Sequence, residues 1–577
     1  MKDIKVFKIL WKYLKNEKGM LFLYIFLVAL SYMPIFLTSL CWGRAITFLT
    51  MKNFNMFSFY IFLYTGVYLL FYGLLYIPED YAYKYLQITF VKEATKDLYD
   101  KMLDLPVIAY EEKGVGELIN RLCNDPDVIM DLLTDLINLM CRSLTVVAII
   151  VIAFNTSYIL VFELIMLAIV MGFITSYFQP KIRKTQEEIK KESDEYSRLS
   201  TENLTGIREI KALGITKRVS QKMHNMMEVM FDKQLKISKY ERWYEGFNNL
   251  LYFTLQGVIF FTCGKLYIEG VITLTVFMMM QTYIWQIDGV VESLNKYAVK
   301  YNKIIVSLKR MDEILSNKLY EDEQFGNVEL ESVKGNITFN DVYFRYREDE
   351  KNTLNGLSLK IEPNKKIAIV GRSGNGKTTI YNVLLRYFPI NKGSVLLDDV
   401  KIEDLTRKSL RNSISIIRQD PYIFHMSIFD NFRLIKEDVT LKEVREYCKK
   451  AYLDDYIMSL PDKYNTMIGE GGVNLSGGQK QRLAIARTLM RDTKIVLFDE
   501  ATSALDNESQ EYIKKTIDDL VKDHTVVIIA HRLSTIIDAD EIYVIDKGIL
   551  VGKGTHKSLL KNNKIYQTLY KNEEKKG

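Results

Sequence analysis

Six long apolar runs in the first half of the chain limit its possible folds more than any other feature. The runs cover residues 20–40, 56–77, 136–153, 158–178, 247–268 and 271–291. Each is close to the ~20 residues that a helix needs to cross the hydrocarbon core of a bilayer. The first run lacks a small-residue cleavage site, so we interpret it as a retained span rather than a signal peptide. The sequence therefore predicts a helical membrane domain with six spans.

Lysine and arginine residues are unevenly distributed among the segments that connect these runs. Residues 1–19 hold six lysines, and the connection at 179–246 holds fifteen lysine or arginine residues, whereas the connection at 155–157 holds none. Because positively charged connections stay on the cytoplasmic side, we expect a plasma-membrane protein with both termini in the cytoplasm. The net charge of +6 then reflects membrane topology, and nucleic acid is not expected as a partner.

The second half of the chain has a different pattern. Beyond residue 335, short β-branched runs alternate with polar stretches of helical period, as in a soluble α/β domain. The sequence predicts a transmembrane domain at 1–316, a linker at 317–334 and a nucleotide-binding domain at 335–577. The five cysteines are far apart and form no C-x-x-C pair, so isolated thiols are expected.

A phosphate-binding motif lies near the start of the soluble domain. Its sequence is GRSGNGKTT, at 371–379, and it follows an apolar strand and precedes a helical pattern. Glycines let backbone N–H groups approach phosphates, and the helix amino terminus favours their negative charge. Lys377 is expected to reach the β- and γ-phosphates, and Thr378 to offer its hydroxyl to Mg²⁺. The predicted nucleotide-binding residues of this loop are Gly371, Arg372, Ser373, Gly374, Asn375, Gly376, Lys377, Thr378 and Thr379.

Two adjacent carboxylates end a second apolar strand, in the sequence KIVLFDE at 494–500. Asp499 is expected to hold Mg²⁺ through water, and Glu500 to orient or deprotonate the water that attacks the γ-phosphate. Carboxylates at strand ends are common, so this assignment depends on the phosphate loop upstream.

The sequence LSGGQ, at 475–479, precedes another helical pattern and provides a second helix amino terminus suited to a phosphate. In these motifs and their order the chain resembles the ATPases of ABC transporters, whose signature LSGGQ matches without change. Six spans ahead of one such domain resemble the half-transporters of the exporter fold. The resemblance implies a six-helix membrane domain followed by an α/β P-loop ATPase domain. The signature residues expected to contact nucleotide are Ser476, Gly477, Gly478 and Gln479.

The resemblance assigns roles to three further residues. Tyr346 matches the aromatic residue that stacks on adenine, Gln419 matches the glutamine that senses Mg²⁺, and His531 matches the histidine that contacts the γ-phosphate. ATP and Mg²⁺ are the implied cofactors. The implied catalytic residues are Glu500, His531 and Lys377, and those at the metal are Thr378, Gln419 and Asp499.

A dimer is implied because the signature of one chain in this family closes over the phosphate loop of another. Unequal heterodimers of the family lose the catalytic carboxylate or the signature in one half. This chain retains both, which favours a homodimer and leaves a heterodimer open. The other expected partners are membrane lipid and the transported substrate.

An ATP-driven exporter is the function that the resemblance implies. It would move a hydrophobic or amphipathic drug, lipid or peptide by alternating access, with ATP hydrolysis coupled to transport. One alternative is an importer of a metallophore built on the exporter fold. The other is a soluble ABC ATPase acting on ribosomes or DNA, against which the six spans argue.

The cytoplasmic connections at 79–134 and 179–246 are too long for turns and predict helical extensions. Within them, 114–127 and 202–214 resemble the coupling segments of the family. In the first segment, Asp125 and Pro126 predict a helix start, with Asp125 as N-cap and Pro126 as the first helical residue.

Tyrosines recur at every fourth position of the second span, from Tyr60 to Tyr76. The outer two suit interfacial anchors. A phenol facing hydrocarbon would lack a partner, so the inner three are expected to face other helices or a substrate cavity. Gln281, Trp285 and Asp288 share one face of the sixth span. The candidate lining of a substrate cavity is Tyr64, Tyr68, Tyr72, Gln281, Trp285 and Asp288.

Three ionisable residues lie within or near the spans: Arg142, Glu163 and Asp288. A charge at the centre of the bilayer costs about 2.5–3.5 kcal/mol on insertion scales. We therefore expect these side chains to face the interior of the bundle.

Overall fold

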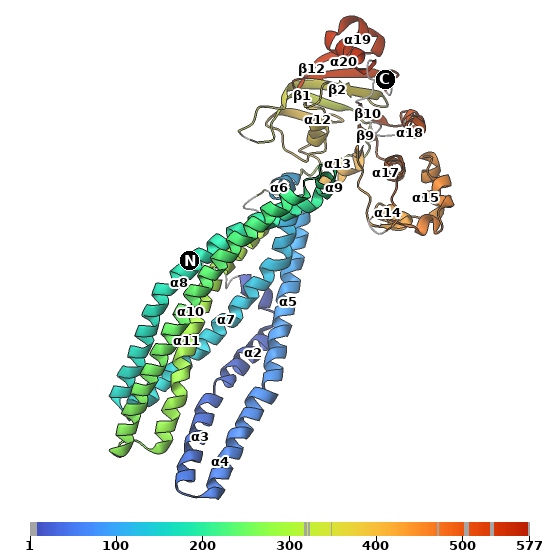
Figure 1. Ribbon diagram of the computed structural model, residues 1–577. Helices are drawn as coiled ribbons and strands as arrows, with labels where there is room; N and C mark the ends of the chain where they lie inside the picture. The colour runs from blue at the N-terminus through green and yellow to red at the C-terminus, as the bar shows by residue number, and fades with distance from the viewer. Residues whose placement is uncertain are drawn as a thin grey trace. The chain divides into compact units, whose positions relative to one another are not determined.

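The computed structural model describes residues 9–316, 320, 323–347, 349–469, 472–500, 507–530 and 536–574 (Figure 1). Contacts between Cα atoms divide the chain into two units. The helical unit comprises residues 1–103 and 115–319, and the ATPase unit comprises residues 104–114 and 320–577. A short piece of the connection predicted at 79–134, residues 104–114, therefore packs with the ATPase unit.

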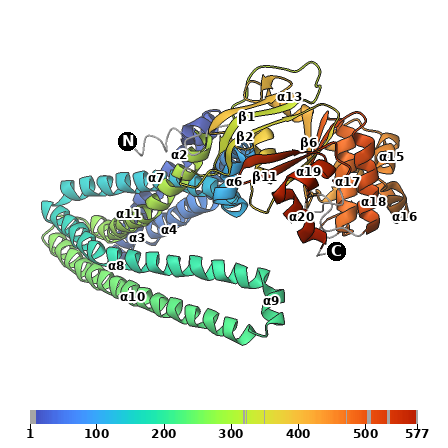
Figure 2. The ribbon, with the colours of Figure 1, turned by 90° about the horizontal axis from the view of Figure 1, so that it is seen from above.

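The helical unit consists of long helices joined by short connections. They are α2 (Lys18–Ser31), α3 (Pro34–Thr50), α4 (Phe54–Tyr68), the π-helix η1 (Leu69–Leu74), α5 (Tyr76–Leu103), α7 (Val115–Thr156), α8 (Tyr158–Thr205), α9 (Ile207–Ala212), α10 (Thr216–Ile268) and α11 (Leu274–Leu315). Figure 2 shows α8 and α10 side by side along their length, with α9 connecting their ends.

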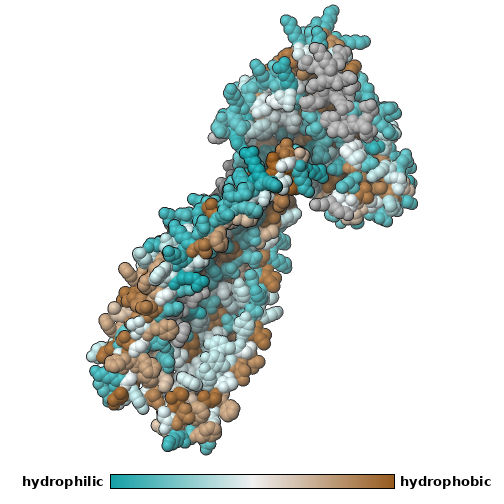
Figure 3. Space-filling model, in the orientation of Figure 1, coloured by the Kyte–Doolittle hydropathy of each residue, from teal (hydrophilic) through white to brown (hydrophobic). Residues whose placement is uncertain are grey.

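Five helical stretches among the described residues are long and apolar enough to cross a membrane: Lys18–Thr50, Phe54–Leu103, Val115–Thr156, Tyr158–Thr205 and Thr216–Ile268. Helix α11 contains residues 274–291 of the predicted sixth span. Brown, hydrophobic surface is spread over the lower part of the helical unit in the view of Figure 3. The first predicted span is interrupted, because α2 ends at Ser31 and α3 begins at Pro34. Proline lacks an N–H group and therefore suits this first helical position.

The expectation of a helix start at Asp125 is wrong. Helix α7 runs without a break from Val115 to Thr156, and Pro126 lies inside it. Asp125 is 4% exposed, and its carboxylate faces Ser307 of α11. The local preference of proline for a first turn is overridden by the packing of α7 against α11.

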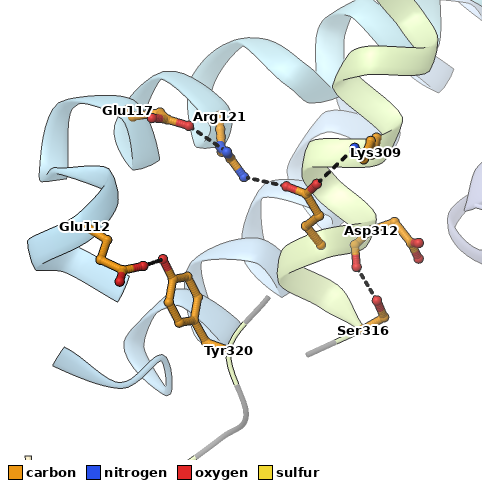
Figure 4. Close-up of polar contacts among 8 residues, drawn as sticks. Glu112, Glu117, Arg121, Lys309, Asp312, Ser316 and Tyr320 are labelled. Atoms are coloured by element: carbon orange, nitrogen blue, oxygen red, sulfur yellow. Dashed lines mark hydrogen bonds and ion pairs between the residues drawn. The ribbon is translucent and has the colours of Figure 1, made fainter. Parts of the chain in front are cut away.

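An ion pair between Arg121 and Glu313 joins α7 to α11, and each of its members has a second partner on its own helix (Figure 4). The Arg121 guanidinium is 2.6 Å from the Glu117 carboxylate and 3.4 Å from that of Glu313. Lys309 is 3.8 Å from Glu313. The Arg121 side chain is only 6% exposed, so the two carboxylates provide the partners that a buried guanidinium needs.

The ATPase unit contains two main sheets. The antiparallel sheet has the order β2-β1-β4-β5. The larger sheet has the order β12-β11-β3-β10-β9-β6, and its strands are parallel except for β12. A third sheet pairs β7 with β8. The strands are β1 (Ile337–Phe344), β2 (Leu354–Ile361), β3 (Lys366–Val370), β4 (Lys392–Leu397), β5 (Val400–Lys401), β6 (Ile414–Ile417), β7 (Met426–Ser427), β8 (Met467–Ile468), β9 (Ile495–Asp499), β10 (Thr525–Ile529), β11 (Glu541–Asp546) and β12 (Ile549–Gly554).

Helices cover the larger sheet, and its central strands are buried on both faces, as parallel strands are in α/β domains. The helices are α6 (Val107–Lys113), α12 (Lys377–Leu384), α13 (Arg407–Ser413), α14 (Ile428–Arg433), α15 (Leu441–Lys450), α16 (Asp454–Ser459), the 3₁₀ turn η2 (Lys463–Asn465), α17 (Gly477–Arg491), α18 (Asn507–Leu520), α19 (His556–Asn562) and α20 (Lys564–Glu574). This arrangement brings the ends of β3, β9 and β10 together at the predicted nucleotide site.

Candidate nucleotide site

The phosphate loop connects β3 to α12, as the sequence predicts. Two of its glycines are required by geometry. A Cβ atom at Gly371 would lie 2.3 Å from the carbonyl oxygen of Ile545. Gly376, the N-cap of α12, has a φ of +89°, a conformation that L side chains rarely adopt. The loop therefore lies close to β11, and its backbone carries no side chain at Gly371 and Gly376.

Lys377 points into the loop of its own chain. Its ammonium donates to the carbonyl oxygens of Gly371, at 2.9 Å, and of Arg372, at 3.1 Å. The side chain is 6% exposed, and burial lowers the pKa of its ammonium, although Glu500 and Asp499 act in the opposite direction. A cation is thus already in place where the predicted β- and γ-phosphates would lie.

Asp499 ends β9 beside the phosphate loop. The Thr378 hydroxyl donates to the Asp499 carboxylate over 3.5 Å. Burial, and then the neighbouring charge of Glu500, raise the pKa of the Asp499 carboxyl. A hydroxyl and a carboxylate are hard oxygen donors of the kind that Mg²⁺ prefers, with water and phosphate oxygens as its other ligands. The pair fits that ion.

Glu500 follows Asp499 in an unusual backbone conformation. Its φ is +52°, and its N–H group donates to the carbonyl oxygen of Ile529 at 3.0 Å. Such a conformation costs a residue with a side chain on the order of 1–2 kcal/mol. The neighbouring strand β10 therefore fixes the direction of the chain at the predicted catalytic carboxylate.

Tyr346 lies against α12. Its hydroxyl is 3.0 Å from that of Thr379, and Asn382 donates to it at 3.3 Å. Its ring makes edge-to-face contacts with Phe344 and Phe388, at centroid distances of 4.8 and 5.2 Å. The ring is thus held next to the predicted nucleotide site.

The signature caps its own helix. The Ser476 hydroxyl accepts from the Gln479 N–H group, and the Gln479 side chain accepts from the Ser476 N–H group at 2.8 Å. This capping box begins α17, whose first residue, Gly477, is exposed. Gln481 of the same helix, 2% exposed, donates to the carbonyl oxygen of Gln419 at 3.0 Å. The signature helix and the glutamine segment after β6 are therefore directly connected.

The remaining predicted residues are distributed as follows. His531 lies outside the described residues. Tyr64 and Tyr68 are on α4 and Tyr72 is on η1. The ring centroids of Tyr64 and Tyr68 are 4.8 Å apart, and those of Tyr68 and Tyr72 are 5.2 Å apart. Gln281 is exposed on α11, which also carries positions 285 and 288.

Two of the ionisable residues in the spans contact neighbouring helices. Arg142 donates to the carbonyl oxygen of Gly289 at 2.8 Å and to the Ser293 hydroxyl at 3.0 Å. Thr262 of α10 donates to the Glu163 carboxylate at 2.6 Å. These contacts agree with the expectation that both side chains face other helices rather than lipid.

Most of the first predicted coupling segment, 114–127, belongs to α7, which begins at Val115. The short helix α6 precedes this segment and packs with the ATPase unit. Val107 and Ile108 of α6 pack against the ATPase core. Tyr320 donates to the Glu112 carboxylate at 2.7 Å (Figure 4). Helix α9 lies within the second predicted segment, 202–214.

Sequence reasoning missed two residues that support the site, Asp546 and Gln481. Asn375 donates to the Asp546 carboxylate at 2.8 Å, which ties the phosphate loop to the end of β11. Gln481 connects α17 to the segment after β6. The position of Asp546 at the end of an apolar strand is a signal that could have found it, whereas the contact of Gln481 depends on the tertiary fold.

Comparisons with known proteins agree with this architecture. Residues 21–289 match the ABC transporter transmembrane region, and residues 354–503 match the ABC transporter family. A putative multidrug export ATP-binding/permease protein, YgaD of Bacillus subtilis (strain 168), is 30% identical over 498 residues, which are 85% of this chain and 86% of that protein. The ATP-dependent lipid A-core flippase of Haemophilus influenzae (strain 86-028NP) is 29% identical over 495 residues, 85% of this chain and 84% of the flippase.

A solved structure of a bacterial Atm1-family ABC exporter with ATP bound superimposes with a TM-score of 0.82 at 25% identity. The match covers 96% of this chain and 98% of that structure. The predicted fold class, a helical membrane domain followed by an ABC ATPase domain, is thereby confirmed. The chain belongs to the ABC transporters, and it is a multi-pass membrane protein that couples ATP hydrolysis to export.

Proposed function

We propose that the chain works as a homodimer with two competent ATP sites, and that it exports an amphipathic molecule by alternating access. The observation that carries this proposal is that one chain contains every part of an ATP site. The phosphate loop, the strand-end carboxylates and a capped signature helix whose first residue, Gly477, is exposed are all present. Two copies would therefore provide two complete sites, each with its phosphate loop from one chain and its signature from the other.

Each residue of the proposed site has a distinct task. Thr378 and Asp499, together with Gln419, would hold Mg²⁺, which supplies positive charge to the phosphate oxygens when bound. Lys377 would turn from the loop carbonyls to the phosphates. Glu500 would orient or deprotonate the attacking water, and His531 would contact the γ-phosphate.

The substrate class rests on the tyrosines of the second span and on the relatives. Tyr68 is 41% exposed and Tyr72 is 52% exposed in the single chain, so their rings and hydroxyls present a surface that is both apolar and polar. Such a surface suits a hydrophobic drug, a lipid or a peptide with a few polar groups. The names of the relatives, a multidrug exporter and lipid A-core flippases, fall within this class.

We further propose that the chain lies in the plasma membrane with both termini in the cytoplasm. The distribution of lysine and arginine supports this orientation. In inside-out vesicles the ATPase domains would then face the added ATP, and a fluorescent hydrophobic substrate would accumulate in the lumen. Release from preloaded vesicles would instead support the alternative importer, and Glu500→Gln provides the inactive control.

Homodimer formation can be tested by complementation between two damaged chains. Lys377→Ala damages the phosphate loop, and Gly477→Asp places a carboxylate at the signature. Co-expressed single variants would form mixed dimers with one intact site, whereas the double variant paired with the native chain leaves no intact site in the mixed dimer. The mixed dimers are isolated by a different affinity tag on each chain. We expect vanadate to trap nucleotide in the dimer of the two single variants, and not in the dimer of the double variant with the native chain. Failure to isolate mixed dimers would contradict the homodimer.

A further inference from the structure

An aromatic cavity of about 570 Å³ lies between α8 and α10. Its apolar lining includes Phe173, Tyr177, Phe178, Trp243 and Phe247. Phe178 and Phe247 lie 6.0 Å apart and Trp243 and Phe247 lie 5.7 Å apart, measured between ring centroids. Because Phe173 is 74% exposed and Trp243 is 56% exposed, the cavity opens to the outside of the helical unit.

Positive charge lies at one end of this cavity. Lys181 and Lys239 line it, and Lys181 lies 3.7 Å from the centre of the Tyr177 ring. A second cavity of about 540 Å³ shares Lys239 and Trp243 with the first and adds Arg242. Among the described residues, no carboxylate lines either cavity, and no ion pair joins these three cations to an acidic side chain. Their charge is therefore available to an external anion.

The order of these residues follows the predicted membrane boundary. The fourth span ends near residue 178 and the fifth begins near residue 247, both on the predicted cytoplasmic side. Phe173 and Phe247 lie within the spans, whereas Lys181, Lys239 and Arg242 lie just beyond them. Eight residues separate Phe173 from Lys181, which is about 12 Å along a helix. Phe173 and Phe247 therefore reach acyl-chain depth, whereas the cations reach head-group depth.

We propose that the two cavities form one binding site for a lipid with an anionic phosphate head group in the cytoplasmic leaflet. The acyl chains would pack on the rings, and the phosphate would lie among the three cations. The cytoplasmic leaflet is rich in anionic lipid, and basic pockets between spanning helices attract such head groups. This lipid is a bound component of the transporter and is independent of which substrate is exported. An aromatic belt alone would pack against any phospholipid and would not select for charge.

Trp243 provides a direct measurement because its ring lines both cavities. The full chain is reconstituted in phosphatidylcholine with increasing fractions of brominated phosphatidylglycerol or brominated phosphatidylcholine. The signal of Trp243 is the difference between the native protein and Trp243→Phe. We expect half-quenching at a mole fraction on the order of tenfold lower for the anionic lipid.

Neutralising the cations separates charge recognition from general contact with lipid. In Lys181→Gln/Lys239→Gln/Arg242→Gln the preference for the anionic lipid should disappear, while quenching by brominated phosphatidylcholine remains and shows that the cavity is still formed. The matched control, Lys217→Gln/Arg218→Gln/Lys222→Gln, removes three exposed cations from the same helix about 25 Å or more away and should keep the preference.

Three outcomes would overturn the proposal. They are equal quenching by both lipids, a preference that survives the triple neutralisation, and protection of Trp243 from both lipids. The last outcome would mean that a second copy of the chain covers the cavity.

Discussion

The Asp104 carboxylate and the Arg407 guanidinium, 303 positions apart in the sequence, form an ion pair of 3.0 Å. Arg407 is also 3.5 Å from the Glu323 carboxylate, which lies in the predicted linker. One side chain on α13 thus holds both the segment that contains α6 and the segment that enters the ATPase domain. Since Asp104 is 58% exposed and Arg407 is 49% exposed, the pair adds at most about 1 kcal/mol to stability. The main effect of the pair is to hold the segment that contains α6 in position on α13.

We therefore expect Arg407→Ala to uncouple transport from hydrolysis. Transport in vesicles should fall several-fold while the ATPase rate changes less than twofold and the thermal midpoint shifts by about 2 °C or less. The exchanged pair, Asp104→Arg with Arg407→Asp, should recover part of the transport, although Glu323 then faces a carboxylate. Equal losses of transport and hydrolysis in Arg407→Ala would argue against a role in coupling.

Glu500→Gln should abolish turnover while preserving ATP binding. The amide cannot accept a proton from water, yet it has almost the same shape as the carboxylate, so we expect a loss of about 10²-fold or more in ATPase rate. Phosphate release and the retention of labelled ATP measure the two effects separately. A variant with near-native hydrolysis would show that another group activates the water.

Lys377→Ala should weaken both nucleotide binding and turnover, because it removes the charge that faces the β- and γ-phosphates. We expect ATP affinity to fall about tenfold or more, as measured by displacement of a fluorescent nucleotide. The matched control is Lys365→Ala, which removes a partly exposed lysine paired with Glu362 next to the same strand. If both variants bind ATP like the native chain, the phosphate-binding role of Lys377 is wrong.

Asp125→Asn should stabilise the protein at neutral and alkaline pH. Burial raises the pKa of the Asp125 carboxyl, despite the Ser307 hydrogen bond and the charges of Arg310 and Arg121, and one of its oxygens lacks a hydrogen-bond partner. Stability is then greatest below the unfolded pKa and falls as the pH rises through the higher folded pKa. The thermal midpoint of the variant should exceed that of the native chain by about 2 °C at pH 8, and by less once the pH falls below the unfolded pKa of the carboxyl. A difference that is independent of pH would contradict this explanation.

Replacing tyrosine by phenylalanine in the second span separates packing from substrate contact. If Tyr68 and Tyr72 bind substrate through their hydroxyls, Tyr68→Phe and Tyr72→Phe should raise the concentration of substrate that half-stimulates ATP hydrolysis several-fold. Pure packing predicts no change with phenylalanine and a lower thermal midpoint with alanine. The second pattern would direct the search for the substrate site to another helix.

Local motifs account for the features that the sequence predicted well. The phosphate loop needs only a strand, a glycine pattern and a helix in succession, and Gly371 and Gly376 meet that need within a few residues. The helical and α/β halves follow from hydropathy and periodicity in the same way. The roles of individual site residues, His531 among them, stay predictions.

Contacts between distant segments account for what the sequence did not predict. Pro126 satisfies every local rule for a helix start, but packing of α7 against α11 keeps the helix continuous through it. The position of α6 depends on the packing of Val107 and Ile108 against the ATPase core and on the ion pair between Asp104 and Arg407, which no spacing within the connection reveals. The link from Gln481 to Gln419 likewise exists only once α17 has packed beside β6.

The π-helical segment η1, Leu69–Leu74, lies in the second half of the second predicted span, 56–77. A π turn accommodates one residue more than an α turn, and the helices on either side keep their own hydrogen bonding and packing faces. The span therefore contains a place where its length can change by one residue without rotating α4 relative to α5. Elsewhere in these helices a single-residue deletion would turn every following side chain by about 100°. Relatives that differ in length within their second span are thus expected to concentrate the difference in this segment.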